Sequence, residues 1–174
     1  MIAQSILRPA GPEAIPRIVA MADSIWRAHY TEIIGEAQVN YMLQRMYAPE
    51  TLARNMAEGQ LFFLLYDGDE QARGFLAVSA DSAAREGFIH KFYIANDTRG
   101  KGLGARAFAD LLARFPEVNA WRLYVNRANY KSVNFYFKMG FKIERCNCLD
   151  IGGGYVMDDF VMVRHGWAEN KPCG

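Results

Sequence analysis

A glycine-rich run carries the residues best suited to hold an anion. It reads Arg99-Gly100-Lys101-Gly102-Leu103-Gly104 and lies between an expected strand and an expected helix. The first N–H groups of a helix lack partners inside the helix, and the helix dipole adds partial positive charge there. Glycines let a phosphate approach the backbone closely, while Arg and Lys side chains add full charges. The run therefore predicts an anion-binding turn, with a plain strand-to-helix turn as the alternative.

The spacing of this run excludes two common nucleotide-binding patterns. An ATP-binding loop of the type G-x-x-x-x-G-K-[ST] places its Lys after the second Gly, whereas Lys101 precedes Gly102. A dinucleotide-binding turn of the type G-x-G-x-x-G needs a longer interval than the one between Gly102 and Gly104, and no strand-helix-strand unit opens the chain. A nucleotide-binding protein is therefore disfavoured.

The charge of the chain is nearly balanced, but its distribution is uneven. The 174 residues carry a formal net charge of +1, which argues against a protein that binds nucleic acid in bulk. Residues 1–98 hold 8 basic and 12 acidic side chains, whereas residues 99–138 hold 8 and 2, a net charge of +6. This basic block indicates a local site for an anion, with a solvated basic helix face as the alternative.

Composition predicts a soluble globular protein. Hydrophobic residues make up 51% of the chain, and no stretch approaches the roughly 18 apolar residues of a membrane helix. No signal peptide is visible, so we expect a cytoplasmic protein that does not act on membranes. Cys146 and Cys148 form a C-x-C pair without a second pair, and Cys173 stands apart. Free thiols and no metal site are therefore expected.

Hydrophobic periodicity predicts how these residues are positioned. After Pro12, apolar residues recur every three or four positions as far as Trp26, which predicts a helix. The polar, aromatic stretch Arg27–Glu32 is interpreted as a connection to the next helix. Further helices are predicted at about 36–46, from Pro49, at 100–115 and at 132–139, and strands at 6–8, 61–66, 74–78, 88–94, 121–125, 141–143 and 155–163. This order predicts a mixed α/β sheet with helices on both faces. We expect a single domain over 1–166 and a loose tail at 167–174.

Two motifs resemble the signatures of the GCN5-related N-acetyltransferase (GNAT) superfamily. The acyl-CoA signature of that superfamily, Arg/Gln-x-x-Gly-x-Gly beyond a strand-end aliphatic residue, is matched by Ile94, Arg99, Gly102 and Gly104. The second signature is matched by Asn129-x-x-Ser132-x-x-x-Tyr136-x-x-x-Gly140-Phe141, in which Ser132 stands where Ala is more usual. The motifs cover residues 88–141, and the N-terminal half matches only in layout. The resemblance implies a GNAT-like fold with a mixed, mostly antiparallel sheet of about six or seven strands.

The resemblance also implies acetyl-CoA as co-substrate. The strand ending at Ile94 would carry a bulge that splays it from the strand at 121–125, and pantetheine would pair with its main chain. Backbone N–H groups of the glycine-rich run would hold the pyrophosphate, and Asn129 would bond the pantetheine arm or fix its loop. The binding residues so implied are Phe92, Tyr93, Ile94, Arg99, Gly100, Lys101, Gly102, Leu103, Gly104, Asn129, Ser132 and Tyr136.

Acetyl transfer needs groups that move protons, and the resemblance supplies one of them. Tyr136 matches a Tyr that protonates the leaving thiolate in similar enzymes, and a phenol pKa of about 10 suits that role. A core aromatic with a satisfied hydroxyl is the alternative. For the general base the candidates are His90, Glu32 and, less favoured, Asp158 or Asp159. A chain of waters without a dedicated base is favoured over each of these.

The acceptor is expected to be an amine. Trp26, Tyr30, Ile33 and Tyr155 would line its pocket together with Glu32, since aromatic rings beside a carboxylate suit a cationic amine; plain packing explains the same residues. The favoured function is direct transfer of acetyl, in a ternary complex, to a primary amine of a small molecule (polyamine-like or other) or of a peptide. The alternative is a non-catalytic acyl-CoA-binding sensor or partner module. A homodimer is suggested by the resemblance alone.

Overall fold

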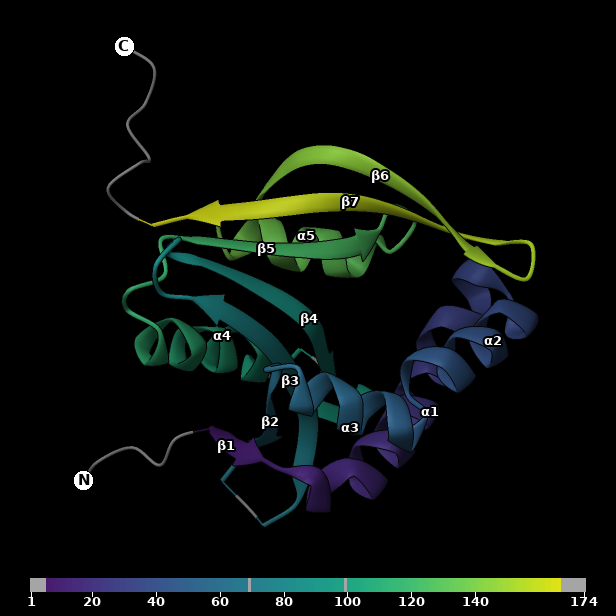
Figure 1. Cartoon of the computed structure of the whole chain (residues 1–174), viewed down its shortest axis with the longest axis horizontal. Helices are drawn as coiled ribbons and strands as arrows, with labels where there is room; N and C mark the ends of the chain where they lie inside the picture. The colour runs from purple at the N-terminus through teal and green to yellow at the C-terminus, as the bar shows by residue number, and fades with distance from the viewer. Residues whose placement is uncertain (1–5, 69, 99, 167–174) are drawn as a thin grey trace. The chain divides into compact units, whose positions relative to one another are not determined.

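The computed structural model describes residues 6–68, 70–98 and 100–166 (Figure 1). The strands are β1 (Leu7–Ala10), β2 (Leu61–Tyr66), β3 (Ala72–Asp81), β4 (Glu86–Ile94), β5 (Ala120–Asn126), β6 (Lys142–Gly152) and β7 (Tyr155–His165). The α-helices are α1 (Ile15–Ile34), α2 (Glu36–Met46), α3 (Pro49–Ala57), α4 (Leu103–Arg114) and α5 (Tyr130–Lys138). Two short 3-10 turns, η1 (Pro12–Ala14) and η2 (Asn96–Thr98), precede α1 and follow β4.

Seven strands form one sheet in the order β1-β2-β3-β4-β5-β7-β6. The pairs β1 and β2, β2 and β3, β5 and β7, and β6 and β7 are antiparallel. Strands β4 and β5 are parallel, and helix α4 connects them. The prediction of a mixed, mostly antiparallel α/β sheet is therefore confirmed.

The chain divides into two compact units, and strand β4 contributes to both. The first unit comprises Met1–Ser79 and Lys91–Ala113, and the second comprises Ala80–His90 and Arg114–Gly174. In the first unit all four central residues of β2, from Phe62 to Leu65, are buried, which requires cover on both faces of that strand. Helices α1, α2 and α3 contact one another, and the N–H of Leu7 in β1 donates a hydrogen bond to Asp110 of α4 at 2.9 Å.

In the second unit β5 lies between β4 and β7, and β6 forms the exposed edge of the sheet. The buried core of this unit includes Trp121, Leu123 and residues 161–163 of β7. Strand β4 begins with a close approach, because a Cβ on Gly87 would lie 2.5 Å from the indole ring of Trp121. The core residues thus fix how β4, β5 and β7 pack within this unit.

The structure corrects the predicted end of the first helix. Helix α1 continues to Ile34, so the stretch from Arg27 to Glu32 is helical and Glu32 belongs to its last turn. Polar side chains in this stretch are satisfied along the helix itself: Arg27 Nε donates to Asp23 at 3.0 Å, and Thr31 Oγ1 donates to the carbonyl of Arg27 at 2.8 Å. A loss of hydrophobic periodicity therefore marked an exposed helical turn rather than the end of the helix.

Two further boundaries differ from the predictions. Helix α4 begins at Leu103 rather than at residue 100, so the first glycines of the glycine-rich run precede the helix. Strand β6 extends to Gly152 because it pairs with β7 along its length, although its side chains are exposed and give little hydrophobic signal. In the described parts of the chain, no helix has the length and apolarity needed to cross a membrane.

Candidate functional site

The glycine-rich turn stands directly before α4. Gly100 and Gly102 have φ values of +81° and +79°, which glycine adopts without strain. Apart from the flanking residues, no atom of the described part of the chain lies within 4 Å of the point where a Cβ on either residue would stand, so the described residues leave the space beside this backbone open. Lys101 is exposed, Leu103 and Gly104 are buried, and Arg99 lies outside the described residues. The turn therefore has the open backbone that a bound phosphate group requires.

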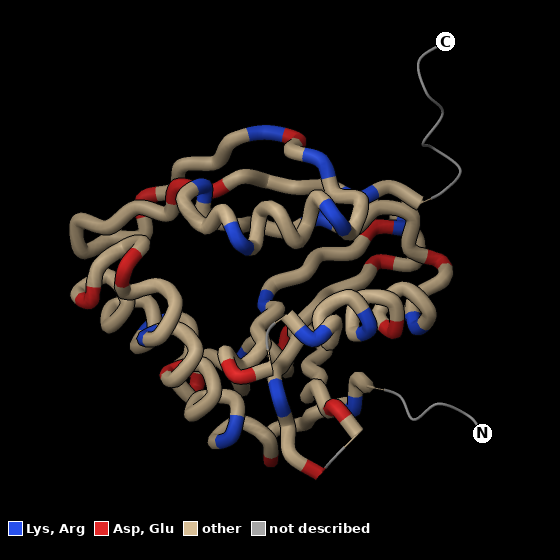
Figure 2. Tube along the Cα trace, turned by 180° about the vertical axis from the view of Figure 1, so that it is seen from behind, with Lys and Arg blue, Asp and Glu red and all other residues tan. Residues whose placement is uncertain are grey.

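Ion pairs neutralise part of the basic block that spans residues 99–138 of the sequence. Figure 2 shows basic positions without acidic ones along α5, where they are Lys131 and Lys138, whereas α4 carries both signs. Arg106 of α4 pairs with an acidic partner, Asp67, and Arg122 pairs with Glu86 at 2.8 Å. The lysines of this block are Lys101, Lys131 and Lys138, and all of them are exposed. The charge left for an anionic ligand is thus smaller than the sequence count indicates.

Asn129, Ser132 and Tyr136 belong to one helical element of the second unit. Asn129 is the N-cap of α5: it is 1% exposed, and its Oδ1 accepts a hydrogen bond from the N–H of Ser132 at 3.2 Å. Tyr136 lies on the same helix, is 8% exposed, and its ring centroid stands 5.5 Å from that of Phe141. The cap gives Asn129 a structural role, and the aromatic packing fixes the ring of Tyr136.

Tyr93 lies in an aromatic cluster of the first unit, made of Trp26, Tyr30, Tyr47, Phe75 and Tyr93. Its ring centroid lies 5.4 Å from that of Phe75 and 6.0 Å from that of Trp26, and Trp26 stacks on Tyr30 at 4.5 Å. Trp26 Nε1 and Tyr47 Oη are buried without a hydrogen-bond partner, and burial raises the pKa of Tyr47. The structure thus brings together two of the residues predicted to line the acceptor pocket, Trp26 and Tyr30.

The remaining residues predicted to line the acceptor pocket belong to both units. Glu32 is exposed in the last turn of α1, and Ile33 is half-buried beside it in the sequence. Tyr155 begins β7 in the second unit. Among the described residues, no ring contact or hydrogen bond joins Glu32 to the aromatic cluster, so its predicted catalytic role receives no geometric support.

Lys91 of β4 is buried beneath the aromatic cluster. It is 5% exposed, and its Nζ lies 5.5 Å from the ring centroid of Tyr47 and 5.9 Å from that of Phe62. No carboxylate of the described residues pairs with it, and burial lowers the pKa of Lys91 to about 8. A buried ammonium held only by aromatic faces is an unfavourable arrangement for the fold.

We expect Lys91→Met to stabilise the protein. The fall in pKa from 10.5 to about 8 corresponds to about 3 kcal/mol. Below pH 8, Lys91 is protonated in both the folded and the unfolded protein, so the full free-energy cost of burying its charge applies. Between pH 8 and 10.5 the unfolded chain holds more protons, so wild-type stability rises with pH and the difference from the variant disappears. Urea unfolding at pH 7 and pH 10 measures this effect, and the exposed Lys138→Met is the matched control. An unchanged or lower stability of Lys91→Met at pH 7 would contradict the account.

The general-base candidates differ in their surroundings. His90 is half-buried on β4, with its ring centroid 4.9 Å from that of Phe88. Asp158 of β7 forms an ion pair with Arg127 at 2.7 Å. Asp159, the next residue, is 3% exposed, and its Oδ2 has no hydrogen-bond partner. Asp159, which the sequence favoured least as general base together with Asp158, therefore has the most unusual environment of these three candidates.

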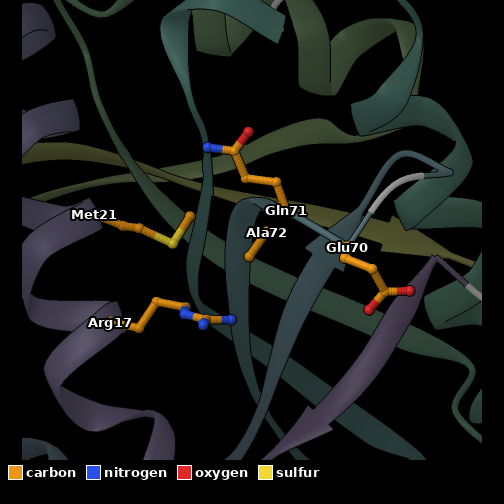
Figure 3. A pocket seen from close by; sticks show the side chains of 5 residues that line it. All are labelled: Arg17, Met21, Glu70, Gln71 and Ala72. Carbon is orange, nitrogen blue, oxygen red and sulfur yellow. The ribbon is translucent and has the colours of Figure 1, made fainter.

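A surface pocket of the first unit is lined by none of the predicted site residues. Figure 3 shows its lining side chains, Arg17 and Met21 from α1 and residues 70–72 from the segment that leads into β3. Arg17 donates a hydrogen bond to Tyr66 Oη at 3.3 Å, and Glu70 pairs with Arg8 at 3.6 Å. Because its charged groups are engaged with neighbours at the surface, this pocket offers no reactive group.

Sequence reasoning missed two features of the first unit. The period of two in β4 places Lys91 on the same face as Ile89 and Tyr93, and the burial of Ile89 and Lys91 agrees with that alternation. The signal for a buried lysine was therefore present. Tyr47 follows the last turn of α2 four residues after Leu43, so it continues the apolar spacing of that helix, yet its burial was not predicted.

Comparisons with known proteins identify the family. A family model described as an acetyltransferase (GNAT) domain matches residues 30–149. A spermidine N(1)-acetyltransferase from Thermoplasma acidophilum is 23% identical over 158 residues, which cover 87% of this chain and 94% of that protein.

Solved structures agree with this result. The PaiA N-acetyltransferase of Thermoplasma acidophilum in complex with coenzyme A superposes with a TM-score of 0.75 at 23% identity, covering 91% of this chain and 97% of that chain. A chimera of the spermidine N-acetyltransferase SpeG from Vibrio cholerae and hSSAT superposes with a TM-score of 0.68 at 18% identity, covering 91% of this chain and 93% of that chain. Because the family model matches more than half of the chain, the chain belongs to the GNAT family of acetyltransferases and is an acyltransferase.

Proposed function

We propose that the protein transfers an acetyl group from acetyl-CoA to a primary amine of a small molecule. The observation that carries this proposal is the open, left-handed glycine turn before α4 in a chain of the GNAT family. Acetyl-CoA supplies an activated acetyl thioester and an anionic pyrophosphate by which it can be held. The relative that acts on spermidine and the solved structure with coenzyme A support this choice of donor and acceptor class.

The pyrophosphate is assigned to the turn from Gly100 to Gly104. An anion is favoured there by the first N–H groups of a twelve-residue helix, which have no partners within the helix, by the open side of Gly100 and Gly102, and by the exposed side chain of Lys101. Calorimetric titration tests the assignment. Acetyl-CoA is expected to bind with a micromolar Kd and ATP much more weakly, whereas tight binding of ATP and none of acetyl-CoA would refute it.

The pantetheine arm is assigned to the main chain of Phe92 and Ile94 at the end of β4. An extended arm with amide groups can pair with such a strand end as an added strand does. Asn129 is assigned the task of fixing the loop before α5, since its side chain already caps that helix. Phe92, Tyr93 and Ile94 are half-buried, and Tyr93 is anchored in the aromatic cluster.

Tyr136 is assigned the proton that the departing thiolate requires. Phenols and alkyl thiols are acids of similar strength in general, so a phenol can protonate a departing alkyl thiolate. Packing against Phe141 and Phe135 holds its ring in one orientation, which lowers the entropic cost of placing the hydroxyl.

For the acceptor, we infer a small primary amine. Electron-rich rings at Trp26, Tyr30 and Tyr93 suit a cationic amine. Initial rates measured by thiol release, with acetyl-CoA and spermidine varied together, test direct transfer in a ternary complex. Intersecting double-reciprocal lines are expected, while parallel lines would indicate a covalent acetyl-enzyme. A short peptide with a free α-amine serves as the comparison acceptor.

A further inference from the structure

Asp159 is a buried acid without a partner. Among the described residues it is the one acidic side chain that is buried, with 3% of its surface exposed, and its Oδ2 accepts no hydrogen bond. Unpaired buried carboxylates are unfavourable, and most buried polar groups in proteins are hydrogen-bonded. The fold therefore gains nothing evident from this side chain.

The surrounding strands explain the absence of a counter-charge. Asp159 lies opposite Asn126 of β5 and Asn147 of β6. On the same face, one pair further along β7, stand Tyr124 of β5 and Arg145 of β6, and Arg145 is already paired with Glu144. Arg122, beyond Tyr124, is paired with Glu86 and Glu144.

The neighbouring acid has a partner where Asp159 has none. Asp158 points to the other face of β7 and holds Arg127 in an ion pair at 2.7 Å. Desolvation by burial, and secondarily the charge of Asp158, raise the pKa of Asp159 to about 6. Its carboxylate is thus ionised at neutral pH but poorly solvated, which makes it a stronger proton acceptor than a surface acid.

Within the second unit, Asp159 lies on the part of β7 that contacts the start of the loop before α5, which the proposed function assigns Asn129 to fix. Asn126, opposite Asp159, ends β5, and the N–H of Arg127 donates to the carbonyl of Asp158 at 3.0 Å. Two residues later Asn129 caps α5, the helix that carries Tyr136. One compact unit therefore holds both a group suited to accept a proton and a group suited to donate one.

We propose that Asp159 is the general base of acetyl transfer, an inference that rests on the proposed function. As the acceptor nitrogen forms its bond to the acetyl carbon, its proton passes to the carboxylate of Asp159. The carbon–sulfur bond breaks with its electron pair on sulfur, and Tyr136 gives that sulfur a proton. Asp159 then releases its proton to solvent and Tyr136 regains one, so both groups return to their starting forms.

The test compares Asp159→Asn with two matched variants. Asp159→Asn is expected to lower kcat about a hundredfold. It should leave the Kd of acetyl-CoA unchanged and abolish the rise of activity with pH near 6. Asp158→Asn and His90→Gln are expected to keep that rise, with the first shifting it to lower pH because the charge of Asp158 contributes to the raised pKa.

Thermal unfolding separates catalysis from folding. Because the folded state holds its proton up to about pH 6 and the unfolded chain only to about 3.8, the carboxylate destabilises the fold at pH 7. Asp159→Asn should therefore raise Tm by several degrees while it removes activity.

Several outcomes would overturn the assignment. Wild-type activity in Asp159→Asn, loss of the rise near pH 6 in His90→Gln, or an increase in KM alone would each exclude Asp159 as the base. An inactive wild-type protein with every amine would instead refute the proposed function itself, and the inference with it.

Discussion

Replacing Tyr136 by phenylalanine is expected to lower turnover about a thousandfold while the Kd of acetyl-CoA stays within a factor of about two. The change removes one oxygen from a side chain that is 8% exposed, so the packing against Phe135 and Phe141 is retained. Without the phenol, the thiolate must leave unprotonated or wait for a proton from water. Activity should therefore fall in kcat rather than in affinity.

Stopped-assay thiol release at saturating acetyl-CoA measures this effect. Tyr130→Phe is the matched control, since Tyr130 begins the same helix and is 72% exposed. It should retain wild-type turnover. A Tyr136→Phe variant with unaltered kcat would remove Tyr136 from the chemistry and leave it a core aromatic.

Gly102→Val is expected to weaken acetyl-CoA binding about a hundredfold or more, which corresponds to at least about 2.7 kcal/mol. Two effects combine. A β-branched residue is strained at a φ of +79°, and its side chain would occupy the open space that the turn offers to a phosphate. The carbonyl of Gly102 also accepts the N–H of Arg106, so a shift of the turn disturbs the first turn of α4.

Gly68→Val separates backbone strain from loss of the binding surface. Gly68 has a φ of +82° and equally open surroundings, but it lies in the turn between β2 and β3. Both variants should lose stability to a similar degree, as urea unfolding would record. Calorimetric titration should show lost affinity only in Gly102→Val, and equal losses in both variants would contradict the assignment of the turn.

The residues of the glycine-rich turn and of α5 could be found from the sequence because their signals are local. Gly100 and Gly102 adopt conformations that their own residue type favours, and Asn129 caps a helix three residues before Ser132. Such features depend on neighbours within one turn of chain, so a single sequence carries them.

Features that depend on distant packing were harder to predict. Alternation along β4 predicted which face Lys91 is on, but the burial of Lys91 depends on Tyr47, which follows α2 and lies more than forty residues away in the sequence. The isolation of Asp159 depends on two strands whose own side chains are engaged elsewhere. The polar end of α1 looked like a connection because Arg27 and Thr31 bond along the helix rather than to the core.

The most direct test of acetyl transfer is the mass of the product. Wild-type protein would be incubated with acetyl-CoA carrying an isotopically labelled acetyl group and with a mixture of spermidine, a simple alkyl amine and a short peptide. We predict that labelled N-acetyl amine accumulates in step with free coenzyme A, with a small amine as the main product. Release of coenzyme A without any labelled amine, or intact acetyl-CoA after incubation with folded protein, would contradict the account.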